Sequence, residues 1–145
     1  MTTDATNPPE GRYAELAQKA IEALSTSHPN QPEHLRFGAA VLTRSGAVYA
    51  ASVFWSATGT LSLHAEHAAL SHAACHGERD VVAVACASTE DPAGALPCHP
   101  CGLCKQLIYE SAMISKIDID VVMASRNGEL VVKKISEMVP YPWPA

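Results

Sequence analysis

The chain has 145 residues, which predicts a single domain over 9–145 with a disordered tail at 1–8. Its formal net charge of −5 argues against a polynucleotide partner, because phosphate binding depends on clustered Lys and Arg. No run of about 18 apolar residues is present, which argues against a membrane span. The polar start lacks the pattern of a signal peptide, so we expect a cytoplasmic protein.

The first half of the chain predicts one helix and a strand pair. Apolar residues recur at helical spacing over Glu10–Leu24, and two prolines mark a loop over Ser25–His34. Strands are predicted at Leu35–Thr43 and Ala47–Phe54. The Arg44–Gly46 turn between them predicts antiparallel pairing.

The second half predicts two more helices and three strands. Helices are expected at His64–His76, where Gly77 stops the helix, and at Cys101–Ala112. The apolar run Val81–Ala87 is typical of a strand covered on both faces. Two final strands, at 117–124 and 129–135, flank an Asn-Gly hairpin signal. This order predicts a three-layer α/β fold around one mixed five-stranded sheet.

The cysteine pattern points to a metal site. The chain has five cysteines, at positions 75, 86, 98, 101 and 104. An odd number with three crowded together favours a reduced, metal-binding set over disulfides. We expect the other two, Cys75 and Cys86, to be core thiols.

Two short motifs define the predicted site, His64-Ala65-Glu66 and Pro100-Cys101-Gly102-Leu103-Cys104. Catalytic zinc sites use three protein ligands in a tetrahedral arrangement and keep one position open for water. His64, Cys101 and Cys104 supply three ligands. Both cysteines lie at a predicted helix start, which favours their thiolate form.

Glu66 follows the first ligand by two positions, so it can face the open position without binding the metal. Zinc lowers the pKa of its water to about 7, and Glu66 is then expected to shuttle the proton. The two motifs in this order are the signature of zinc deaminases, H-x-E…P-C-x-x-C. The prediction is hydrolytic removal of an amino group from a small cytosine-like ring.

A closed zinc knot is the main alternative. Cys98 would supply the fourth ligand, and the chain would be a non-catalytic zinc-structured binding module. This reading leaves Glu66 without a role, so the open site is preferred.

With these motifs in view, the chain resembles the cytidine deaminase family, in the small-subunit class that includes blasticidin S deaminase. The resemblance covers most of the chain and rests on the segments 37–43, 101–106 and 138–143. It implies an α/β sandwich, one zinc per subunit and a homo-oligomer, a tetramer or a dimer. It also implies that the Ala65 backbone contacts the ring carbonyl and that Trp143 covers a neighbouring subunit's site.

The chain departs from that family at the metal. The class usually has cysteine as first ligand and an arginine after the glutamate, where this chain has His64 and His67. One imidazole and two thiolates leave zinc neutral, so the arginine is dispensable. His67 is expected either beside the ligands or, more simply, on an ordinary helix face.

A second departure concerns the substrate. The positions that hold the ribose hydroxyls in the family carry Val53 and Trp55, and the aromatic of the opening strand aligns with Leu35. Losing such hydrogen bonds changes preference strongly, so plain cytidine is not expected to be the best substrate. A free base, a modified cytosine or a bulkier analogue fits better. Other aminated rings, such as an antibiotic nucleoside, a pterin or a guanine-type base, stay open.

Overall fold

The computed structural model describes residues 10–145, so the predicted tail at 1–8 lies outside the described residues. Within the described residues, four α-helices and five strands follow one another in the order α1 (Glu10–Ala23), β1 (Phe37–Thr43), β2 (Val48–Ser52), α2 (Ala65–Cys75), β3 (Val81–Ser88), α3 (Gly102–Ser115), β4 (Asp120–Ala124), β5 (Leu130–Lys134) and α4 (Ile135–Met138). Short 3₁₀ turns lie at Leu24–Thr26 and Gly59–Leu61. The order predicted from the sequence is confirmed, with α4 as an addition.

The five strands form one mixed sheet in the order β2-β1-β3-β4-β5. β1 is antiparallel to both β2 and β3, whereas β3 and β4 run parallel. That parallel pair is connected through α3, as a crossover requires. The Asn127-Gly128 hairpin joins β4 to the antiparallel β5, as predicted. All but the last residue of β3 is buried, in agreement with its continuous apolar sequence.

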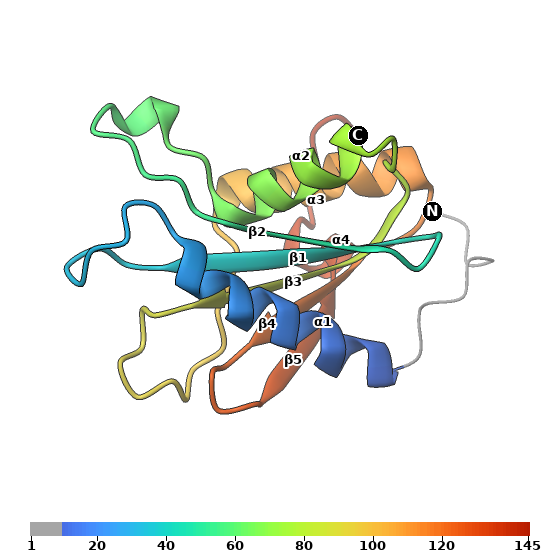
Figure 1. Ribbon diagram of the computed structural model, residues 1–145. Coiled ribbons are helices and arrows are strands. Elements are labelled where there is room, and N and C mark those ends of the chain that lie inside the picture. Colours follow the sequence, from blue (N-terminus) through green and yellow to red (C-terminus); the bar gives the residue numbers. More distant parts are fainter. Residues whose placement is uncertain (1–9) are drawn as a thin grey trace.

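Helices cover both faces of the sheet, which confirms the predicted α/β layers. Figure 1 shows α1 across one face and α2 with α3 side by side on the other. Gly38 of β1 lies so close to α1 that a Cβ atom there would come 2.1 Å from the carbonyl oxygen of Ala20. Only glycine permits this approach, and it brings α1 tightly onto the sheet.

Several helix and strand boundaries differ from those predicted from the sequence. β1 begins at Phe37 instead of Leu35, and β2 ends at Ser52 instead of Phe54. The Val53 NH still bonds to the Phe37 carbonyl of β1, but Phe54 pairs with Leu63 instead of continuing along β1. α3 continues to Ser115 instead of ending at Ala112, so β4 begins at Asp120 instead of residue 117.

One core prediction is wrong. Cys86 of β3 is buried as expected, but Cys75, the last residue of α2, is exposed. The buried face of α2 carries Ala65, Ala69 and Ala73, and a residue two positions after Ala73 projects from the opposite side. None of the helices in residues 10–145 is long and apolar enough to cross a membrane.

Candidate metal centre and active-site cavity

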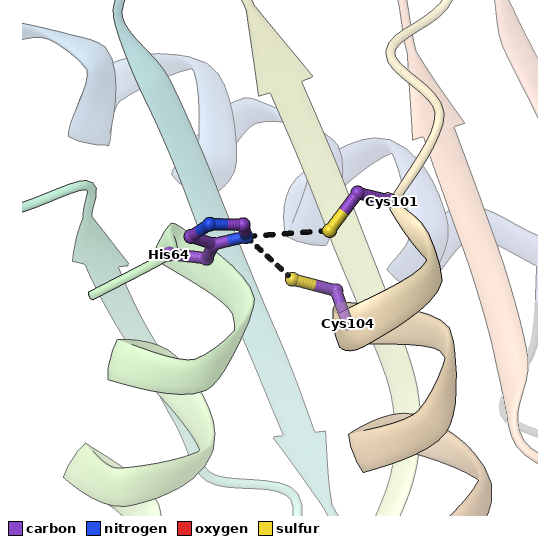
Figure 2. A group of neighbouring side chains, drawn as sticks. All are labelled: His64, Cys101 and Cys104. Atoms are coloured by element: carbon purple, nitrogen blue, oxygen red, sulfur yellow. Dashed lines mark hydrogen bonds between the residues drawn. The ribbon is translucent and has the colours of Figure 1, made fainter. Parts of the chain in front are cut away.

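Three candidate ligands converge where two helices begin. His64 is the N-cap of α2, Cys101 is the N-cap of α3, and Cys104 lies in the first turn of α3. The Nδ1 atom of His64 lies 3.3 Å from the Cys101 sulfur and 3.4 Å from the Cys104 sulfur (Figure 2). All three ligand atoms lie within 4.8 Å of one another, and no other such group occurs in the described part of the chain.

This geometry fits zinc. Bond lengths of about 2.0–2.1 Å to nitrogen and about 2.3 Å to sulfur place the two ligand atoms about 3.5 Å apart in a tetrahedron. The observed nitrogen–sulfur separations, 3.3 and 3.4 Å, are close to this value. The three side chains therefore form a potential zinc site with little rearrangement.

Glu66 lies beside these ligands without joining them. It is the second residue of α2, is only 6% exposed, and accepts a hydrogen bond of 3.2 Å from the Cys104 thiol at Oε2. A buried carboxylate next to an open metal position can accept or donate a proton there.

The pKa of Cys104 depends on whether a cation is bound beside it. Burial, followed by the negative charge of Glu66, raises the pKa of the Cys104 thiol well above its usual value. The sulfur therefore keeps its proton unless a positive charge offsets both effects. A divalent cation supplies that charge, as expected of a site that binds metal through thiolates.

Neither Cys98 nor His67 belongs to the ligand group. Cys98 is 4% exposed, its backbone NH bonds to Ala124, and its carbonyl accepts a hydrogen bond from the Cys86 thiol. His67 is exposed on the outer side of α2. The group thus consists of three candidate ligands.

A cavity of about 270 Å³ adjoins the ligands. The predicted site residues that line it are His64, Ala65, Glu66, Cys101, Cys104, Val53 and Trp55. Trp55 presents its ring edge-on to His64, with centroids 6.3 Å apart, and its Nε1 donates to the Leu35 carbonyl at 3.0 Å. Because that bond uses the indole NH, Trp55 offers only its ring to the cavity.

Three lining residues were not predicted: Phe37, Glu90 and His99. Phe37, not Leu35, is the aromatic of the opening strand that reaches the cavity, because Leu35 precedes β1 and is exposed. Glu90 and His99 come from the loop between β3 and α3. The one sequence feature that points to any of these three residues is the position of His99, two residues before the candidate ligand Cys101.

Trp143 does not line the cavity of its own chain. Its carbonyl accepts a 2.6 Å hydrogen bond from Gln106, and the next carbonyl, of Pro144, accepts one of 2.8 Å from Tyr109. These contacts hold the backbone of the C-terminal segment against α3 and leave the Trp143 side chain exposed, with the residue 76% accessible.

Comparisons with known proteins agree with this geometry. The model of the cytidine and deoxycytidylate deaminase zinc-binding region matches residues 11–120. A cytidine deaminase of Halalkalibacterium halodurans is 31% identical over 126 residues, which cover 86% of this chain and 89% of the relative. A blasticidin-S deaminase of Bacillus cereus is 28% identical over 130 residues, with coverages of 87% and 88%.

A solved structure is also similar. The crystal structure of cytidine deaminase from Burkholderia pseudomallei has a TM-score of 0.75 and 26% identity, covering 89% of this chain and 97% of its own. These matches favour neither the non-catalytic zinc module nor a deaminase of pterins or guanine-type bases. The chain belongs to the cytidine and deoxycytidylate deaminase family and is a zinc-dependent hydrolytic deaminase.

Proposed function

We propose that this chain hydrolyses the exocyclic amine of a cytosine-type ring, as a base or a nucleoside, to the keto form and releases ammonia. The observation that carries the proposal is the meeting of three zinc-type ligands and the buried Glu66 at one cavity. Relatives named cytidine deaminase and blasticidin-S deaminase support this class of substrate.

His64, Cys101 and Cys104 would hold the zinc. When bound, zinc lowers the pKa of a coordinated water to about 7 and so supplies a nucleophile at neutral pH. Glu66 takes a proton from the attacking water and delivers it to the ring nitrogen, and then takes the proton of the new hydroxyl group and delivers it to the departing amine. The water oxygen bonds to the ring carbon, the carbon–nitrogen bond breaks, and ammonia leaves.

Other groups orient the ring. Ala65 is the first residue of α2, so its NH has no partner within the helix and can donate to the ring carbonyl. Phe37 and Trp55 meet edge-to-face, with ring centroids 6.0 Å apart, and give the cavity an aromatic wall. Such a wall suits a flat heterocycle.

The side chains of Val53 and Trp55 offer no free hydrogen-bonding group to the ribose hydroxyls. Val53 is apolar, and the indole NH of Trp55 is engaged by Leu35. We therefore propose that a free base, a modified cytosine or a bulkier analogue is preferred over plain cytidine.

We further propose a homo-oligomer, a tetramer or a dimer, in the cytoplasm. Large apolar side chains are exposed on α3 and the C-terminal segment, namely Leu103, Met113, Ile114, Tyr141 and Trp143. Exposed apolar surface of this kind is typical of subunit interfaces. All five cysteines are free thiols, which suits a reducing compartment.

A substrate screen tests the function. Zinc-loaded protein is mixed with cytosine, cytidine, deoxycytidine and ring- or sugar-modified cytidines, and ammonia release is measured. We expect turnover of at least one cytosine-type ring, with plain cytidine below the best substrate. Absence of ammonia from every cytosine compound would refute the proposal, and cytidine as the best substrate would refute its specificity.

A further inference from the structure

Two polar side chains that line the cavity have no role in the proposed reaction. The cavity is lined by the zinc-type ligands, Glu66, an apolar or aromatic wall, and two further polar residues, Glu90 and His99. Both residues are exposed, and within residues 10–145 neither the Glu90 carboxylate nor the His99 ring has a hydrogen-bond or ion-pair partner. A polar substituent on the substrate therefore finds its side-chain partners there.

The fold explains why Glu90 reaches this cavity. Phe37 pairs with Ser88 in the β1–β3 ladder, and Arg36 and Thr89 exchange hydrogen bonds of 2.9 and 3.0 Å just beyond it. These hydrogen bonds direct the chain that follows β3 along the end of β1. Glu90 is consequently held beside the same cavity that Phe37 lines.

None of the described residues lining the cavity is Lys or Arg. Arg126 donates a hydrogen bond to the Asp91 carbonyl, next to Glu90, but it does not line the cavity. The neighbouring Asp91 is occupied, because its carboxylate accepts hydrogen bonds from the NH groups of Ala93, Ala95 and Leu96 at 3.1, 2.7 and 2.9 Å. Glu90 is thus the available carboxylate, and it repels phosphate and attracts a cationic donor.

There is also room for a substituent. Glu90 and His99 line a second cavity of about 450 Å³ whose other walls come from the same loop and from Ser88 at the end of β3. The two cavities therefore meet at these two side chains, and a group attached to the ring can extend past them.

We propose that Glu90, with His99 beside it, forms a subsite for a positively charged hydrogen-bond donor on the sugar side of the substrate and disfavours a phosphate there. This inference rests on the proposed deaminase function. In this subsite, contacts from the β3–α3 loop take the place of the hydrogen bonds to the sugar that Val53 and Trp55 cannot make.

The test compares three nucleosides that differ only at the 5′ position: cytidine, 5′-amino-5′-deoxycytidine and cytidine 5′-monophosphate. For the zinc-loaded enzyme we expect kcat/KM to decrease in the order amine, hydroxyl, phosphate. Glu90→Gln should reduce the preference for amine over hydroxyl about tenfold, as loss of a charge-assisted hydrogen bond implies. In the unchanged enzyme, that preference should also weaken at high salt.

Glu129→Gln is the matched control, because Glu129 is exposed in the β4–β5 turn and lines neither cavity. It removes the same charge and should keep the order of the three compounds. An unchanged preference in Glu90→Gln, or a wild type that handles the phosphate as well as the amine, would overturn the subsite.

Binding separates this proposal from the function itself. Calorimetry on the zinc-loaded Glu66→Gln variant, with and without Glu90→Gln, ranks the affinities of the same compounds without turnover. An amine preference that disappears with Glu90→Gln supports the subsite even if no ammonia is released. Ammonia release combined with no dependence on Glu90 refutes the subsite alone, and absence of both binding and turnover refutes both proposals.

Discussion

Glu66 and Cys104 share a buried contact that places a carboxylate within 3.2 Å of a candidate ligand sulfur. Each group alone would be costly to bury in its charged form. A cation bound by His64, Cys101 and Cys104 would offset the charge of both groups. The chemistry of the site is therefore decided by a few side chains at two helix starts.

Glu66→Gln keeps the size and burial of this side chain and removes its ability to take a proton. We expect kcat to fall about 10³–10⁴-fold, at the upper end of what general acid–base catalysis contributes, while zinc stays bound. Ammonia release and metal content are measured on one sample. A variant with wild-type activity would show that Glu66 is not the proton shuttle.

The ligand set can be tested by exchanging cysteines. Cys101→Ser is expected to weaken zinc affinity more than about 100-fold, beyond the usual effect of a residue that only supports a ligand. Cys98→Ser is expected to retain one zinc per subunit, because Cys98 is outside the ligand group. Metal content and zinc-dependent thermal stabilisation are the measurements. Loss of zinc from Cys98→Ser would instead support the closed zinc site with Cys98 as its fourth ligand.

At the scale of elements, the end of α2 is tied to the β1–β2 turn through Glu78. Its carboxylate accepts hydrogen bonds from Ser45, Tyr49 and Thr43, the last at 3.1 Å. The bonds from Ser45 and Tyr49 hold the pKa of Glu78 below its ordinary value of 4.5. This contact fastens the helix whose other end carries His64 and Glu66.

The lowered pKa of Glu78 predicts a pH-dependent contribution to stability. Because the pKa is lower in the folded state than in the unfolded chain, the stabilisation is complete above about pH 4.5 and is lost as the pH falls through the folded value. We expect Glu78→Gln to lower Tm at pH 7, with the difference from wild type shrinking below pH 4.5. Glu33→Gln, in an exposed loop, is the control. An equal difference at all pH values would contradict this account.

At the scale of the whole molecule, the C-terminal segment stands out. Hydrogen bonds from Gln106 and Tyr109 hold its backbone on α3, whereas Tyr141 and Trp143 are 96% and 76% exposed. Anchored backbone with exposed aromatic rings suits contact with a second subunit. The proposed oligomer gives this segment a partner.

Subunit complementation tests whether Trp143 covers a neighbouring site. Trp143→Ala and Glu66→Gln are each expected to have low activity alone. Co-expressed, they should form mixed oligomers in which some sites have both residues intact, so activity should exceed that of either parent. Tyr141→Ala is the control for loss of an exposed aromatic. Full activity of Trp143→Ala alone, or no gain on mixing, would exclude the shared site.

The sequence by itself determined the order of helices and strands, the mixed sheet and the candidate ligands. These follow from local signals, namely apolar periodicity, turn residues and closely spaced metal-binding side chains at helix starts. Helix periodicity did not reveal that Cys75 faces outward, since an alanine-rich helix carries little contrast between its faces.

Only the tertiary structure decided which distant residues share the cavity. Phe37 and Glu90 are far apart in the chain, and they meet because β1 pairs with β3. The bond from Trp55 to the Leu35 carbonyl, which leaves Glu90 and His99 as the unengaged polar groups, likewise joins two separate loops. Such contacts depend on strand register and loop closure, which residue spacing does not encode.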